Sequence, residues 1–163
     1  MITLKSYVCD EWQAGSGAGT VLKHAVTGEE IATVGSRGLN FRKMLDYGRE
    51  VGGPALRAMS FPRRAALLKE MAGVLGQHLP EFYEIAASYG ATRFDAWMDI
   101  EGGIGTLAAY SSMARRRLPD STFVVDGDVE GLSKGGTFVG QHIWVSLEGV
   151  AVGDMAARVT AGR

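Results

Sequence analysis

Three acidic residues lie close together in one predicted helix, at a spacing that could support metal binding or proton transfer. Asp95, Asp99 and Glu101 follow one another at intervals of four and two residues. Carboxylates grouped in this way can bind a hard cation or act as general acids and bases. The same spacing fits a solvated acidic face near a helix N-terminus, where the helix dipole stabilises negative charge. We favour the solvated face and assign no metal ligand.

The single cysteine and the three histidines form no recognisable catalytic or metal-binding set. Cys9 is predicted within a short strand, without a cationic neighbour in sequence that would activate its thiol. The histidines are dispersed, and none has a second ligand at metal-binding spacing: His24, His78 and His142. Patterns of phosphate-binding loops, serine hydrolases and zinc peptidases are missing. The residue chemistry alone therefore predicts no catalytic and no cofactor-binding residue.

Arg115, Arg116 and Arg117 form the densest positive cluster in the sequence. Such a cluster can bind phosphate, but cations are also common at a helix C-terminus, where they offset the negative pole of the dipole. We favour the helix-terminus interpretation. The formal net charge of −1 gives no argument for a nucleic acid or a membrane surface as a partner.

The predicted helix of residues 90–117 contains three glycines in its interior: Gly102, Gly103 and Gly105. Thr92 can cap its start, with Asp95 completing a capping box, and Pro119 prevents its continuation. Each interior glycine costs about 0.5–1 kcal/mol relative to alanine. Close helix packing or a kink would explain them, and so would space for a ligand beside the helix. Spacing alone does not decide between these explanations.

Further helices are predicted over residues 40–51, 60–79 and 81–88. Gly52-Gly53-Pro54 is expected to end the first of them. For the second, a spacing of four and three predicts an inward face of Phe61, Ala65, Leu68, Ala72, Leu75 and Leu79. Its outer side is predicted to carry Arg63, Arg64, Lys69 and Glu70. The inward stripe of the glycine-containing helix is predicted to be Trp97, Ile100, Ile104 and Leu107.

Short strands are predicted on both sides of these helices. Residues 6–12, 21–26 and 31–34 suggest an N-terminal β meander. After Pro119, a polar excursion with a short strand at 122–125 precedes a β-rich segment of residues 137–147, a turn, and a strand starting at 150–152. The sequence thus predicts an α+β chain with an N-terminal β meander, a helical unit and a C-terminal β-hairpin.

The composition describes an ordinary globular chain. The sequence has 163 residues, of which 46% are hydrophobic and 21% charged. Its one cysteine allows no internal disulfide, which favours a reducing compartment. The sequence contains neither a signal-peptide pattern nor an apolar run of membrane-spanning length. We expect a cytoplasmic protein.

The ordered segments resemble the N-terminal portion of aldehyde dehydrogenases. The resemblance begins with the Trp12 strand, the turn of residues 26–29 before the IATV strand, and the RAALL helix of residues 64–68. It is sharpest in PALRAMSFPRRAALLK, residues 54–69, and GATRFDAWMDIEGGIGTL, residues 90–107. These stretches look like the dehydrogenase half of the bifunctional phenylacetate-degradation enzymes. Their semialdehyde dehydrogenase cousins from benzoyl-CoA oxidation are the nearest alternative.

The resemblance implies a truncated piece of the α/β aldehyde dehydrogenase fold. Residues 1–152 would be a partial N-terminal region, with a helical unit at 39–118 and an association hairpin at about 137–152, and residues 153–163 a divergent tail. The family oxidises CoA-linked semialdehydes such as 3-oxo-5,6-dehydrosuberyl-CoA semialdehyde with NADP or NAD. In the phenylacetate enzymes, a hydratase-like domain opens the oxepin ring of the CoA thioester. The family's catalytic cysteine, general-base glutamate and cofactor-contacting lysine match no residue of this sequence, so we expect the chain alone to be inactive.

The resemblance also implies two further roles. The family places the counterpart of the 90–117 helix along its substrate tunnel, so Met98, Gly102 and Gly103 are predicted to line a widened tunnel. The family uses the hairpin near 137–152 in subunit association, which predicts a homo-oligomer, with neither nucleic acid nor membrane as a partner. The alternative is a non-catalytic structural or oligomerisation module that joins a partner through this hairpin.

Overall fold

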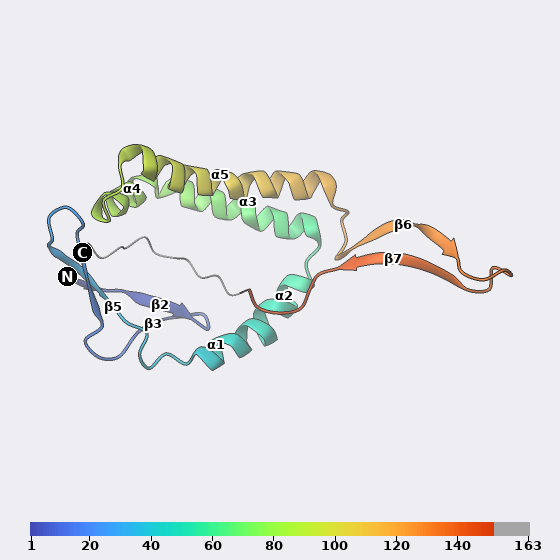
Figure 1. Cartoon of the computed structure of the whole chain (residues 1–163), viewed down its shortest axis with the longest axis horizontal. Coiled ribbons are helices and arrows are strands. Elements are labelled where there is room, and N and C mark those ends of the chain that lie inside the picture. Colours follow the sequence, from blue (N-terminus) through green and yellow to red (C-terminus); the bar gives the residue numbers. More distant parts are fainter. Residues whose placement is uncertain (152–163) are drawn as a thin grey trace.

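The computed structural model describes residues 1–151 and combines a small β region, a layer of helices and a projecting β hairpin (Figure 1). The predicted tail of residues 153–163 and the end of the predicted strand at residue 152 lie outside the described residues. Within the described part, no helix is both long and apolar enough to cross a membrane.

Five short strands open the chain: β1 (Ile2–Thr3), β2 (Lys5–Val8), β3 (Glu11–Ala14), β4 (Thr20–Lys23) and β5 (Glu30–Val34). β4 pairs antiparallel with β5, and β1 pairs parallel with the other edge of β5. β2 and β3 form a separate antiparallel hairpin. β5 confirms the strand predicted at 31–34, and β4 confirms the first half of the strand predicted at 21–26, which ends at Lys23. The simple meander is wrong, because β5 pairs with β4 on one edge and parallel with β1 on the other.

The predicted strand at residues 6–12 is also wrong as a single element. It divides at Cys9 and Asp10, whose φ angles of 49° and 71° make a two-residue turn between β2 and β3. Hairpin turns of this kind normally use glycine or asparagine, which tolerate positive φ. With a cysteine in that place, the sequence carries little turn signal, and Cys9 was predicted in a strand.

Six helical segments follow: α1 (Phe41–Tyr47), the π-helix η1 (Gly48–Gly52), α2 (Gly53–Arg57), α3 (Phe61–Gln77), α4 (Leu79–Ser88) and α5 (Arg93–Arg117). Asn40 caps α1, because its side chain accepts the N–H of Lys43 at 2.9 Å. The predicted stop at Gly52-Gly53-Pro54 is wrong. The N–H of Gly53 reaches the carbonyl of Gly48, and Pro54 falls in the first turn of α2, where its missing N–H does no harm.

The core of the helical layer is the contact between α3 and α5, which lie side by side along their length (Figure 1). Small residues are buried on both helices: Ala65 and Ala72 on α3, and Ala96 and Ser111 on α5. The hydroxyl of Ser111 donates to the carbonyl of Ala65 at 2.6 Å. The small side chains let the two backbones approach, and the hydroxyl satisfies its own hydrogen-bonding need inside the contact.

The predicted faces of these two helices are largely confirmed. All six residues predicted to face inward from the first of them are buried or half-buried. On α5, Ile100, Ile104 and Leu107 are half-buried as predicted. Trp97 is the exception, since it is 46% exposed while Ala96 takes the buried position one residue earlier. The apolar stripe was therefore read one residue out of phase at its N-terminal end.

Arg64 was predicted on the outer side of α3, and this is wrong. The residue is half-buried, and its Nε donates to the carbonyl of Met59 at 3.1 Å. Its Nη1 donates to the hydroxyl of Ser146 at 3.0 Å, and its guanidinium lies over the ring of Phe61. Arg64 therefore links the segment around Ser146 to the start of α3. Local sequence periodicity cannot reveal this contact.

The two ends of α5 follow the sequence prediction. The hydroxyl of Thr92 accepts the N–H of Asp95 at 3.1 Å and donates to its carboxylate at 2.7 Å, which confirms the N-terminal cap. The three arginines occupy the last turn, and the helix ends at Arg117. Between these ends the helix is continuous through its glycines. Within residues 1–151, a Cβ added at Gly102, Gly103 or Gly105 would meet no other part of the chain within 4 Å, so close packing against the described residues does not explain these glycines.

The last two strands, β6 (Phe123–Gly131) and β7 (Val139–Val145), form an antiparallel hairpin that projects away from the helices (Figure 1). The predicted hairpin within residues 137–152 is wrong, because β7 pairs with β6 and residues 146–151 contain no strand. The predicted strand at 122–125 was too short. A register irregularity between Asp126 and Glu130, with Gly127 at a φ of 79°, gave this part of β6 the appearance of a loop.

Candidate functional site

Two hollows border α5, and they differ in chemistry. The first is an apolar groove of about 310 Å³ between α4, α5 and the end of α3. Its lining residues are Leu75, Phe82, Ile85, Tyr89, Ile100, Gly103 and Ile104. The hydroxyl of Tyr89 is the one polar side-chain group among them. Such a groove can receive an apolar side chain or an acyl chain, but it offers nothing that would bind a charged ligand.

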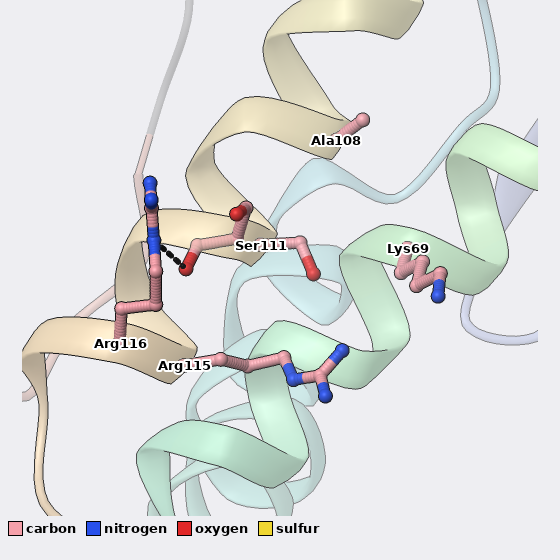
Figure 2. Close-up of a pocket in the computed structure, with 6 residues that line it drawn as sticks. Lys69, Ala108, Ser111, Arg115 and Arg116 are labelled. Carbon is pink, nitrogen blue, oxygen red and sulfur yellow. Dashed lines mark hydrogen bonds between the residues drawn. The ribbon is translucent and has the colours of Figure 1, made fainter.

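The second hollow is polar and basic, with a volume of about 410 Å³ (Figure 2). It lies between α3 and the C-terminal half of α5, and its lining residues are Lys69, Ala108, Ser111, Ser112, Arg115 and Arg116. Two of the three arginines predicted merely to terminate α5 therefore line the same hollow as a lysine from another helix. Among residues 1–151, no carboxylate lines this hollow.

The predicted tunnel residues do not together line either of these two hollows. Gly103 lines the apolar groove, where its missing side chain leaves the wall open. Gly102 does not line either hollow, and Met98, which is 53% exposed, lies outside both as well. The open space beside all three α5 glycines is compatible with a ligand or another part of a protein lying there.

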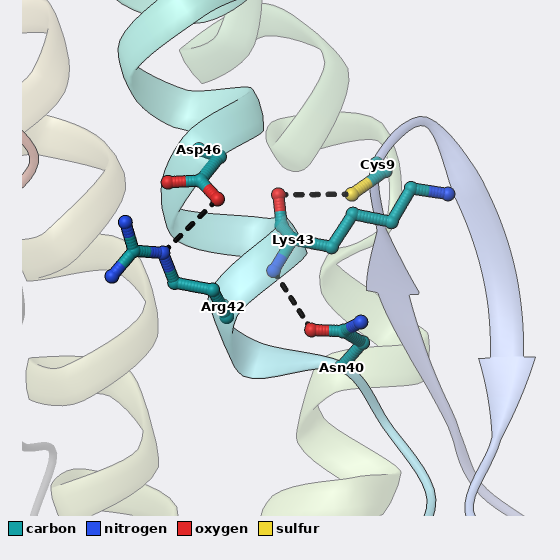
Figure 3. Close-up of polar contacts among 5 residues, drawn as sticks. All are labelled: Cys9, Asn40, Arg42, Lys43 and Asp46. Carbon is teal, nitrogen blue, oxygen red and sulfur yellow. Dashed lines mark hydrogen bonds and ion pairs between the residues drawn. The ribbon is translucent and has the colours of Figure 1, made fainter.

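Cys9 lies at the tip of the β2–β3 hairpin, next to α1 (Figure 3). Its thiol is partly exposed and points to the backbone carbonyl of Lys43 at 3.8 Å, a weak sulfur hydrogen bond. No histidine or carboxylate side chain is hydrogen-bonded to the thiol within residues 1–151. A nucleophilic cysteine needs a neighbouring base or a concentration of positive charge. The observed contact instead ties the hairpin to the helix.

Two of the three histidines and two of the three helix acids are used in local structure. His24 accepts backbone N–H groups of its own turn, and His78 pairs with Glu81 at 3.1 Å. Asp95 is occupied in the cap of α5, while Glu101 accepts a hydrogen bond from the phenol of Tyr83 at 2.7 Å. Within residues 1–151, no group of three histidine, cysteine or acidic side chains is placed to hold a metal ion.

Tyr83 and Glu101 are a pair that sequence reasoning missed. They join α4 to α5, and the guanidinium of Arg93 lies 4.2 Å from the centre of the Tyr83 ring. The hydrogen bond to Glu101 raises the pKa of the Tyr83 phenol above its ordinary value of 10.0. The residues are 18 positions apart, so only the antiparallel arrangement of the two helices reveals the contact.

The sequence was compared with known proteins. No family model matches it. The 3,4-dehydroadipyl-CoA semialdehyde dehydrogenase of Aromatoleum evansii is 36% identical to it over 150 residues, which is 91% of this chain. This chain is related to the aldehyde dehydrogenases. The resemblance to the aldehyde dehydrogenases is thereby confirmed. The matched region is 29% of the length of the Aromatoleum evansii enzyme, so that enzyme's activity belongs to a much longer chain.

Proposed function

We propose that this chain is part of an NAD(P)-dependent dehydrogenase for CoA-linked semialdehydes in aromatic-acid catabolism. The observation that carries the proposal is the 36% identity, over 91% of the chain, to a semialdehyde dehydrogenase whose substrate is an acyl-CoA. The residue motifs favour the phenylacetate branch, with its suberyl-CoA semialdehyde. The relative's own name specifies an adipyl-CoA semialdehyde, which is shorter. A cytoplasmic location would suit a protein that works on CoA thioesters.

The glycine-rich turn of this chain does not fit a dinucleotide-binding turn. The glycine-rich turn after β3 leads into strand β4 rather than into a helix, so it offers no helix N-terminus for a pyrophosphate. Cys9, the one thiol, lies in a turn without a base at hydrogen-bonding distance. The chain would thus supply the helical layer beside the substrate, while other parts of a complete enzyme would supply the thiol and the cofactor site.

A chimera tests the family function directly. The matched segment of the Aromatoleum evansii enzyme is replaced by residues 1–151 of this chain, and NAD(P)H formation is measured with adipyl-CoA and suberyl-CoA semialdehydes. We expect a folded chimera that keeps turnover of a CoA-linked semialdehyde. A chimera that folds, as judged by circular dichroism, but oxidises only short free aldehydes would contradict the proposal.

The unmodified chain provides the complementary test. It is assayed with NADP, NAD and the same semialdehydes beside a Cys9→Ala variant. We expect no turnover by either protein, because the covalent chemistry of the family needs an activated thiol. Turnover that the alanine substitution abolishes would show that Cys9 is the nucleophile and would reject the assignment of the chemistry to other parts of the enzyme.

The tunnel hypothesis can be tested in the same chimera. Gly102→Leu and Gly103→Leu would fill the open space beside α5, whereas Met98→Leu nearly conserves volume. We expect the leucine side chains at Gly102 and Gly103 to raise KM for the CoA substrate far more than KM for a short aldehyde. Equal effects on both substrates would leave the glycines without a role in substrate access.

A second candidate function is subunit association through the β6–β7 hairpin. One face of this hairpin is apolar and exposed, and its residues form two cross-strand pairs: Phe123 with Val145, and Val125 with Ile143. Their exposures range from 42% to 69%. We propose that this face joins a second copy of the chain, since a two-stranded ribbon with an unpartnered apolar face is poorly stable in water.

Sedimentation of the purified chain at tens of micromolar tests this association. We expect an oligomer that Ile143→Lys and Val145→Lys convert into a monomer. His142→Lys adds a charge to the opposite face of the same strand and should leave the oligomer intact. A monomeric unmodified chain would contradict the association, and equal dissociation by all three variants would show that general charge repulsion is responsible.

A further inference from the structure

The basic hollow between α3 and α5 is the strongest feature that the proposed function leaves unused. It brings Lys69 together with Arg115 and Arg116, which lie 46 and 47 residues further along the chain. We propose that these three cations hold a phosphate group of a small-molecule ligand. The proposal rests on the geometry of the hollow and does not require dehydrogenase activity.

The positive charge of this hollow comes from two separate helices. A helix C-terminus by itself explains Arg115, Arg116 and Arg117, because cations there offset the dipole. It does not explain why a lysine from the middle of α3 borders the same space. Figure 2 shows the Arg115 side chain extending from α5 over α3, the helix that carries Lys69.

Among the described residues, Lys69, Arg115 and Arg116 each lack an ion pair. The Nε of Arg116 donates a hydrogen bond to the carbonyl of Ser112 at 3.3 Å, a local bond expected at a helix end. Within residues 1–151, the side chains of Lys69 and Arg115 make no hydrogen bond to another residue, and both line the hollow. Cations that line one hollow without a carboxylate among its described lining residues favour an anion there.

The shape and the remaining polar groups favour phosphate over a carboxylate. The hollow of about 410 Å³ exceeds what a single carboxylate needs. Ser112 adds a hydroxyl from α5, whereas the hydroxyl of Ser111 is already committed to Ala65. A planar guanidinium fork can bind two phosphate oxygens at once, and a lysine adds a compact charge to a third. Three cations and one hydroxyl thus suit a dianion with three free oxygens.

Two sources can supply such a group. The phosphates of CoA and those of an adenine dinucleotide share this chemistry, and inorganic phosphate is the simplest probe of it. The full chain is titrated with inorganic phosphate, CoA, 3′-dephospho-CoA, NADP and NAD while amide shifts are followed by NMR. We expect phosphate to move the amides of residues 69 and 112–116, with weaker changes elsewhere.

Variants of the cluster decide whether the site is specific. Lys69→Gln and Arg115→Gln should each weaken phosphate binding about tenfold, as expected for losing one charge-assisted hydrogen bond. Lys69→Arg should retain binding. Arg117→Gln is the matched control, because it removes the same charge from the same helix end but does not line the hollow. It should change the affinity by less than about twofold, the size of an exposed charge effect.

Each outcome supports or overturns the proposal. A preference for CoA over 3′-dephospho-CoA would identify the ligand as the CoA end of the substrate, and a preference for NADP over NAD would identify the cofactor. Equal binding of all phosphate compounds would show a general phosphate site. Equal weakening by Arg117→Gln and Arg115→Gln, or no shift with any of the five compounds, would overturn it. Because only binding is measured, an inactive protein leaves the result intact.

Discussion

The α3–α5 pair and the β6–β7 hairpin differ in the burial of their apolar surface. In the helix pair, small residues are buried and a hydroxyl is satisfied inside the contact: Ala65, Ala72, Ala96 and Ser111. In the hairpin, large apolar residues are exposed, including Trp144 at 64% and Val145 at 69%. The helices bury their contact surface within this chain, whereas the hairpin leaves large apolar side chains exposed, where a partner can contact them. The comparison separates a structural layer from an attachment surface.

Hydrogen exchange should show the largest difference between the two regions. Amides in the middle of α3 and α5 should exchange at least about a hundredfold more slowly than the paired amides of β6 and β7, because local opening of an unsupported ribbon exposes little apolar surface. Mass spectrometry of quenched, digested samples would resolve the two regions. Equal protection at a concentration where the chain is monomeric would break the comparison, since the hairpin would then be stable without a partner.

Overfilling the helix contact should have the next largest effect. Ala65 is 1% exposed, so Ala65→Leu would force α3 and α5 apart and lower the free energy of unfolding by about 1–3 kcal/mol. Ala109→Leu, which adds the same side chain to an exposed position of α5, is the control and should change stability by less than about 0.5 kcal/mol. Urea denaturation followed by circular dichroism measures both. Similar midpoints for the two variants would mean that the contact is loose.

The buried hydroxyl in the same contact should matter less than the packing. Ser111→Ala removes the 2.6 Å bond to the Ala65 carbonyl and should cost about 1 kcal/mol, the net value of one hydrogen bond. Ser112→Ala changes the neighbouring exposed hydroxyl and should be nearly neutral. The difference between the two urea midpoints is the informative quantity, and its disappearance would assign the stability of the pair to packing alone.

Loss of one hydrogen bond in the hairpin should lower the stability of the chain by even less. Trp144→Phe removes the 2.8 Å hydrogen bond from Trp144 Nε1 to the carboxylate of Asp126 but keeps an aromatic ring. Because the tryptophan is 64% exposed, water can replace this bond, and the thermal midpoint of the helices should shift by less than the equivalent of about 0.5 kcal/mol. A larger shift would show that the hairpin contributes to the stability of the helices.

Sequence patterns predicted the helix pair well because its determinants are local or periodic. The Thr92 cap, the stop before Pro119 and the inward face of α3 each follow from a few neighbouring residues. The phase error at Trp97 arose because the larger apolar residue was expected to be buried, whereas Ala96 is 3% exposed and Trp97 is 46% exposed.

A second group of errors lies where distant segments meet. The pairing of β6 with β7, the parallel return of β1 to β5 and the bond from Arg64 to Ser146 join residues far apart in the sequence. Local propensity carries no information about such contacts. The sequence predicts only part of the basic hollow. It indicates the arginine cluster, but it places Lys69 only on the outer side of another helix.

A pH titration addresses the smallest effect, at the contact between α4 and α5. The pKa of Tyr83 is raised because its phenol donates to Glu101, a bond that the phenolate cannot make. The folded pKa therefore exceeds the unfolded one, so the bond contributes stability below the ordinary phenol pKa of 10.0 and loses it as the pH rises through the folded value.

Near-ultraviolet absorbance follows the ionisation of the phenol, and Tyr83→Phe identifies which transition belongs to this residue. Glu101→Gln should move that transition to lower pH, because the amide has no charge with which to favour the protonated phenol. Asp99→Asn, two residues earlier on α5, removes an equal charge that makes no hydrogen bond to Tyr83 and should leave the transition nearly in place. Identical titrations for the Gln and Asn variants would mean that the general acidity of the α5 face, and not the Tyr83–Glu101 hydrogen bond, sets this pKa. The two helices would then be joined at this end by packing and by the stacking of Arg93 on the ring.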